Sequence, residues 1–264
     1  MIGSIIGDVV GVPFEFAPTK DKDFVMFSNS ATFSDDSILT IATADALLNK
    51  LTYEEAYLKW SKNYPRRGYG NMFLEWIEND DRKPYNSYGN GSAMRVSPIA
   101  YLPFGNISEV MLEAKKTSEV THNHEEGIRG AQAIAAVIFL AINNIPKDTI
   151  KNFVQLVIGY DLNRKLDDIR PTYGFEVSCQ SSVPESIICF LESTSFEDAI
   201  RLAISMGGDA DTMACITGGI AEAYYKEIPK FMYDETMNRL PNEFKEIIKQ
   251  FDNEFRNKFG IKII

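Results

Sequence analysis

Two short acidic clusters are the strongest candidates for chemistry in this sequence. The first is FSDDS at residues 33–37 and the second is GGDADT at residues 207–212. Each combines two carboxylates and a hydroxyl at the expected start of a helix. Either cluster alone could be a helix cap, because Ser and Asp accept hydrogen bonds from the first turn. Together they offer a set of hard oxygen donors, which suits Mg²⁺ or Mn²⁺ better than zinc.

The spacing within each cluster bears on how cations would be held. Asp35 and Asp36 are adjacent and point in different directions, so each could serve one of two neighbouring ions. Asp209 and Asp211 would diverge by about 200° in a regular helix. They can converge only where the backbone is not yet helical, which the preceding glycines permit. An EF-hand is rejected, because residues 216–220 are apolar.

A second pattern lies near the start of the chain. Glycines at positions 3, 7 and 11 repeat every four residues, which favours a close contact between two helices. Glu15 follows Pro13 at what we expect to be a loop entry. It is either an ordinary surface charge or a carboxylate directed at a cleft.

Two further motifs could bind a ligand. The turn YGNGSAMR at residues 88–95 can expose N–H groups to an anion, and Arg95 could support a phosphate or pair with an acidic neighbour. His122, in THNH before an apolar helix, is either a polar cap or a hydrogen-bonding group for a ligand. With only two histidines in the chain, a histidine-rich metal site is excluded.

Helical periodicity dominates the sequence and predicts one all-α domain over residues 1–264, an orthogonal or bundle-like assembly of many helices. The segment from Glu125 to Asn143 is expected to be the most buried helix, and Pro184 is placed in a first turn. The loops at 17–33 and 161–178 are long and therefore candidates for function. Helices are expected at residues 37–49, 52–63, 108–119, 125–143, 184–192, 209–225 and 242–258.

Composition narrows the class of protein. The formal charge is −10, from 27 basic and 37 acidic residues, which argues against general nucleic-acid binding. No apolar run reaches the roughly 20 residues that span a bilayer, and the apolar start is not read as a signal peptide because it lacks a basic leader. Three cysteines without metal-ligand spacing predict reduced, buried thiols and a cytoplasmic protein. We favour a monomer, although nothing in the sequence fixes the oligomeric state.

The motifs GDVVGVPFE, FSDDS, GNGSAMR, the TH pair and GGDADT occur in this order. They resemble the signature blocks of the ADP-ribosylglycohydrolase family, from residue 3 to about residue 220. The resemblance implies a compact all-α fold with a binuclear magnesium or manganese centre at its middle. It also implies hydrolysis of the glycosidic bond between ADP-ribose and an acceptor, such as an arginine or serine side chain of a protein or a small molecule.

The resemblance assigns roles to individual residues. Glu15 matches a glutamate near the metals, and either Glu15 or Asp36 is expected to take the proton of the attacking water. His122 matches a histidine that lines the ADP-ribose cleft. The matched metal ligands are Ser34, Asp35, Asp36, Asp209, Asp211 and Thr212, and the matched diphosphate and ribose contacts are Gly89, Asn90, Gly91 and Ser92. Ser34 stands where threonine is usual and offers the same oxygen.

A different class of function stays open at this point. Some relatives of the family serve as eye-lens crystallins, so the chain could bind ADP-ribose without cleaving it. A silent relative would usually have lost part of the acidic set. This sequence keeps both clusters and Glu15, which favours an enzyme.

Overall fold

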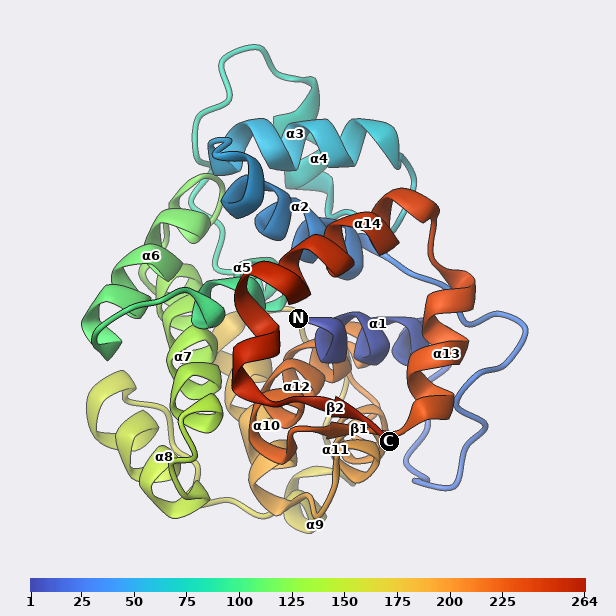
Figure 1. The fold of residues 1–264 in the computed structure, drawn as a ribbon. Coiled ribbons are helices and arrows are strands. Elements are labelled where there is room, and N and C mark those ends of the chain that lie inside the picture. The colour runs from blue at the N-terminus through green and yellow to red at the C-terminus, as the bar shows by residue number, and fades with distance from the viewer.

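Helices are almost the only regular secondary structure in this computed structural model, which describes residues 1–264 (Figure 1). Its first half contains α1 (Ile2–Glu15), α2 (Asp35–Asn49), α3 (Tyr53–Asn63), α4 (Asn71–Glu78), α5 (Gly91–Met94), the 3₁₀ helix η1 (Ser97–Tyr101), α6 (Ile107–Glu119) and α7 (Glu125–Ile142). The second half contains α8 (Lys147–Phe153), the π-helix η2 (Val154–Ile158), α9 (Leu166–Ile169), α10 (Cys179–Glu192), α11 (Phe196–Ile204), α12 (Ala210–Tyr225), α13 (Lys230–Arg239), α14 (Asn242–Phe251), the π-helix η3 (Asp252–Arg256) and the 3₁₀ helix η4 (Asn257–Phe259). Strands β1 (Glu227–Ile228) and β2 (Lys262–Ile263) form a short parallel pair. The predicted all-α fold class is confirmed.

Helices α1 and α12 pack at main-chain contact distance near the middle of the molecule (Figure 1). A methyl group added at Gly7 would overlap the carbonyl of Ala214, and one at Gly3 would overlap that of Gly218. At Gly11 the added methyl would overlap the main chain of Asp211. The glycine repeat therefore marks a close helix–helix contact, as the sequence predicts, and it sets the distance between Asp8 and Asp211.

Helix α2 begins where the first acidic cluster predicts. Ser34 is its N-cap, and the Ser34 hydroxyl accepts a hydrogen bond of 3.2 Å from the Asp36 N–H. The Asp35 N–H donates instead to the carbonyl of Arg67 at 2.8 Å, which ties the start of α2 to the loop before α4. In Figure 1, α2, α3 and α4 gather at one end of the molecule and α9, α10 and α11 at the other.

One continuous cluster of 70 buried apolar residues forms the core. Helix α7 contributes fully or almost fully buried side chains such as Ile134, Val137 and Ile138, each worth about 1.5–3 kcal/mol of burial free energy. The expectation that residues 125–143 form a buried helix is confirmed, with α7 ending at Ile142. No helix combines the length and apolarity that crossing a membrane would need.

Three local predictions were wrong. Helix α10 begins at Cys179, with Ser178 as its extended N-cap, so Pro184 lies inside the helix and residues 179–182 are helical rather than a preceding loop. Pro13 likewise lies inside α1, so Glu15 is the last helical residue and not part of a loop. A proline interior to a helix removes one hydrogen bond and crowds the carbonyl of the preceding turn, a cost that burial of the surrounding apolar residues can offset. The loop expected over 161–178 contains α9.

Candidate metal centre and active site

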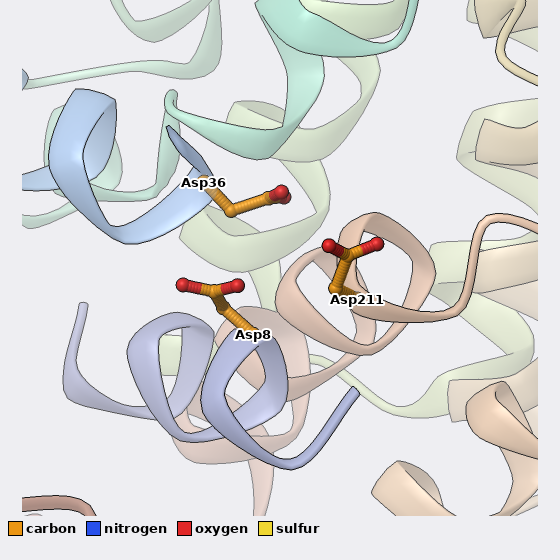
Figure 2. Close-up of side chains that lie close together, drawn as sticks. All are labelled: Asp8, Asp36 and Asp211. Carbon is orange, nitrogen blue, oxygen red and sulfur yellow. The ribbon is translucent and has the colours of Figure 1, made fainter. Parts of the chain in front are cut away.

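Three carboxylates from three different helices meet in the interior. Asp8 of α1, Asp36 of α2 and Asp211 of α12 each offer an oxygen within 4.8 Å of the others, and all three residues are buried. Figure 2 shows Asp36 and Asp211 on facing helix ends, with Asp8 on the neighbouring turn of α1. Since α1 and α12 are in main-chain contact, Asp8 and Asp211 cannot separate without disrupting the core.

A second carboxylate group adjoins the first. Glu15, Asp209 and Asp211 also offer oxygens within 4.8 Å of one another, so Asp211 belongs to both groups. Asp209 is the N-cap of α12, with φ −70° and ψ 82°, outside the helical region. Gly207 before it has φ +64°, a conformation that favours glycine. The two aspartates converge through non-helical backbone, as the spacing predicts.

The cluster hydroxyls lie among these carboxylates. Ser34 Oγ donates to Asp8 Oδ1 at 2.6 Å and lies 3.2 Å from Asp36 Oδ2. Thr212 Oγ1 donates to the same Asp36 oxygen at 3.2 Å. The other oxygen of Asp36, Oδ1, is buried and has no hydrogen-bond partner in the protein. An unpartnered buried carboxylate oxygen is costly, and a cation would satisfy it.

Asp35 stands apart from both groups. It is half-buried and lines the cavity beside Gly68, where an added methyl group would come within 2.9 Å of Asp35 Oδ1. Asp35 lies beside Gly68, whereas Asp36 lies beside Asp8 and Asp211, which fits the expectation that the adjacent carboxylates point in different directions.

The electrostatics of the site are unfavourable without a cation. Burial raises the pKa of Asp36 and of Asp211 well above the ordinary value, and repulsion among the carboxylates adds to this. Burial, with repulsion from Asp209 and then Asp8, raises the pKa of Glu15 to about 7. Burial also raises the pKa of Asp209, against the hydrogen bond that Asn90 Nδ2 donates at 2.7 Å. Cations placed among these oxygens would remove both the desolvation cost and the repulsion.

A cavity of about 410 Å³ opens above the carboxylates. Its acidic floor consists of Glu15, Asp35, Asp36, Asp209 and Asp211, and its wall includes Gly89, Asn90, Gly91 and His122. The predicted glycine turn and histidine are therefore brought together with both acidic clusters. Ser92 is the exception, because its buried hydroxyl donates to the Gly127 carbonyl at 2.7 Å and does not line the cavity.

The family model described as ADP-ribosylglycohydrolase matches residues 1–259. The chain belongs to the ADP-ribosylglycohydrolase family. The predicted enzyme class, a glycosidic-bond hydrolase, is confirmed at the level of this family.

Curated relatives and a solved structure resemble the whole chain. ADP-ribosylhydrolase ARH3 of Danio rerio is 25% identical over 301 residues, covering 85% of this chain and 81% of its own. ADP-ribosylarginine hydrolase Tri1 of Pseudomonas putida (strain GB-1) is 24% identical over 297 residues, covering 96% and 78%. A solved structure titled "ADP-ribosylglycohydrolase-related protein complex" shares the fold, with a TM-score of 0.73 at 19% identity over 96% of this chain and 95% of its own.

The structure changes the interpretation of two residues, Arg95 and Asp8. Arg95 does not pair with an acidic neighbour, one of the two options that the sequence left open, since it is fully buried and hydrogen-bonds to Thr117 and Thr121. Asp8 was not singled out from the sequence, although it sits in the middle of the carboxylates. The available signal was a single charged residue within the apolar run of residues 1–14, next to a glycine of the repeat. The three cysteines are free and buried, as predicted.

Proposed function

We propose that this protein hydrolyses the glycosidic bond between ADP-ribose and an acceptor, most readily a protein side chain such as arginine. The observation that supports it is the convergence of five carboxylates at the floor of a cavity whose wall includes a glycine turn and a histidine. The cavity volume lies in the range of small-ligand sites. The related proteins are named ADP-ribosylhydrolase and ADP-ribosylarginine hydrolase, which agrees with this choice of substrate. We further propose that residues 1–264 act as one catalytic domain.

We propose two divalent cations, Mg²⁺ or Mn²⁺, as the cofactors. The donors fit such ions, because every one is a hard oxygen and Asp36 Oδ1 is buried without a partner. Asp211 has an oxygen within 4.8 Å of Asp36 and also within 4.8 Å of Asp209, which supports a pair of sites that share Asp211 rather than one site. The proposed ligands are Ser34, Asp35, Asp36, Asp209, Asp211 and Thr212.

Asp8 has a different role in this proposal. It accepts hydrogen bonds from the N–H of Ser34 at 3.0 Å and of Ser37 at 3.1 Å, and from the hydroxyls of both serines. Four donors satisfy its two oxygens. Asp8 is therefore better suited to hold the start of α2 in place than to bind a cation.

Bound divalent cations would lower the pKa of a water and stabilise negative charge on substrate oxygens. The cleaved sugar passes through an oxocarbenium-like state, which neighbouring carboxylates stabilise electrostatically. Between the two candidate bases, Glu15 is the better placed to accept the proton of the attacking water. Glu15 is only half-buried and makes no hydrogen bond within the protein, whereas Asp36 Oδ2 already accepts one from Thr212. Glu15 also faces the cavity.

The test is release of free ADP-ribose from a panel of ADP-ribosylated arginine and serine substrates, with Mg²⁺, with Mn²⁺ and with chelator. Asp36→Asn should abolish release, and Asp148→Asn, an exposed carboxylate outside the cavity, should leave it unchanged. Metal-dependent release would support the proposal and name the acceptor. ADP-ribose binding without release from any substrate would instead support a binding protein without hydrolase activity. A protein that neither binds nor releases ADP-ribose would refute the assignment of the site.

A further inference from the structure

Arg95 is the only cationic side chain that lines the cavity, and it is fully buried. No carboxylate pairs with it. Its guanidinium lies 4.2 Å from the centre of the Tyr57 ring, and Nε and Nη1 have no hydrogen-bond partner. Nη2 donates to the Thr117 carbonyl at 2.9 Å and to Thr121 Oγ1 at 2.8 Å. An unpaired buried charge is costly, so its presence beside a ligand cavity calls for a functional explanation.

The Thr121 hydroxyl connects Arg95 to His122. Its oxygen accepts from Arg95 and lies 2.7 Å from His122 Nδ1. A guanidinium can only donate, and a hydroxyl has one proton of its own. With the Arg95 bond occupying an acceptor position, the Thr121 proton is free to go to Nδ1. A neutral His122 then carries its proton on Nε2.

The rest of the surroundings hold His122 in place and leave Nε2 free. The His122 N–H donates to the Ser118 carbonyl at 2.7 Å, and Ser118 Oγ donates back to the His122 carbonyl at 2.8 Å. Nε2 makes no hydrogen bond within the protein. It faces the glycine turn, since a methyl group added at Gly91 would lie 3.1 Å from it. Burial, reinforced by the positive charge of Arg95, lowers the pKa of His122 well below its usual range, so the ring is neutral.

We propose that Arg95 and Thr121 are positioning residues that fix His122 as the Nε2–H tautomer, which donates a hydrogen bond to an anionic diphosphate oxygen of the ligand. This inference rests on the proposed function. An anion is favoured at this place because Nε2 faces the glycine turn, away from the carboxylates of the floor, and Arg95 is the one cation that lines the cavity. The hydrogen bonds from Arg95 to Thr121 and from Thr121 to His122 hold the Nε2–H donor within the positive potential of Arg95.

The tautomer can be read directly by ¹⁵N NMR of histidine-labelled protein, because the chain has only two histidines. His124→Asn assigns the spectrum, since His124 is the N-cap of α7 and asparagine also suits that position. In the wild type we expect His122 with a protonated Nε2 and an unprotonated Nδ1. Thr121→Val should lose this single tautomer and Thr121→Ser should keep it. A wild-type ring protonated on Nδ1 would overturn the proposal, and this arm needs no variant to fold.

Calorimetric titration in magnesium buffer with ADP-ribose, ADP and adenosine tests the role in binding. Thr121→Val should weaken ADP-ribose and ADP by about tenfold each and leave adenosine unchanged, with Thr121→Ser close to wild type. Equal weakening of all three ligands, or of none, would overturn the proposal. Weakening of ADP-ribose alone would overturn the assignment to the diphosphate and move the bond to the second ribose.

The hydrolysis panel separates the two proposals. If the wild type hydrolyses its substrate and Thr121→Val changes neither hydrolysis nor ligand binding, only the positioning role of Arg95 and Thr121 is refuted. A wild-type protein that neither binds ADP-ribose or ADP nor releases ADP-ribose would refute the proposed function and the ligand assignment that rests on it.

Discussion

Thr212 donates a hydrogen bond to Asp36 across 176 positions of the chain, with Oγ1 3.2 Å from Oδ2. The bond joins the first turn of α12 to the first turn of α2. Each acidic cluster therefore does more than cap its own helix, because a hydroxyl at the start of α12 donates a hydrogen bond to a carboxylate at the start of α2. The same juxtaposition leaves Asp36 Oδ1 buried and without a partner.

Removal of divalent cations should make stability fall as the pH rises. The raised carboxyl pKa values mean that the folded protein keeps protons which the unfolded chain has already lost, so unfolding releases protons. For Glu15 the loss runs from its ordinary pKa of 4.5 to about 7. Melting temperature measured across this range in chelator should decrease with pH, and Mg²⁺ should flatten the curve. A curve in chelator that is flat or rises with pH would contradict the proposed carboxylate repulsion.

Glu15→Gln should lower kcat by about 100-fold or more while ADP-ribose affinity changes little, because a general base contributes to the transition state rather than to ground-state binding. Steady-state kinetics and calorimetry on the same preparation check both halves. Glu125→Gln, an exposed residue outside the cavity lining, is the matched control. If Glu15→Gln kept full kcat, Asp36 would become the stronger candidate for the base.

Gly7→Ala should destabilise the protein severely, by about 3 kcal/mol or more, because the new methyl group would overlap the Ala214 carbonyl and force α1 away from α12. Urea unfolding measures the loss. Gly174→Ala offers the same substitution where an added methyl group meets no atom within 4 Å, and it should change the free energy of unfolding little. Similar effects for the two variants would show that the contact is not tight.

Glu222→Gln should cost about 3–5 kcal/mol, since it leaves Arg256 buried and without its closest charge partner. The two side chains are 0% and 5% exposed, and Arg256 Nε lies 2.6 Å from Glu222 Oε1. The control is Glu235→Gln, whose pair with Arg239 lies within one helix and is partly exposed. That exposed pair should contribute about 0–1 kcal/mol. Equal losses of unfolding free energy in the two variants would mean that burial does not determine how much the Glu222–Arg256 pair contributes to stability.

The sequence was informative wherever a local pattern carries its own physical cause. The cap at Ser34, the repeat of glycines at 3, 7 and 11, and the need for non-helical backbone at Asp209 all follow from the geometry of one helix end or one helix face. The ADP-ribosylglycohydrolase resemblance then placed the two clusters in one site. The structure agrees with each of these local expectations.

The sequence was less informative where tertiary packing decides. Pro13 and Pro184 were read as signs of a helix start or a loop, although both lie inside helices that the core stabilises. The role of Asp8 is also tertiary, because this residue of an apolar segment accepts hydrogen bonds from Ser34 and Ser37 of another helix start. The burial of Arg95 could not be anticipated either, because its partners Thr117 and Thr121 lie more than 20 positions away.

The contact between α1 and α12 has a consequence for how such a protein can diversify. The floor of the cavity rests on helices with no space between them for even a methyl group, so its geometry tolerates little mutation. The mouth is different, because Phe175, which lines the cavity, is 56% exposed and stacks on Phe16, which is 82% exposed. Under the proposed function, mutation there would alter which acceptor is admitted and leave the carboxylate floor intact. Selection for new substrates is therefore free to act on surface loops, while the interior retains one chemistry.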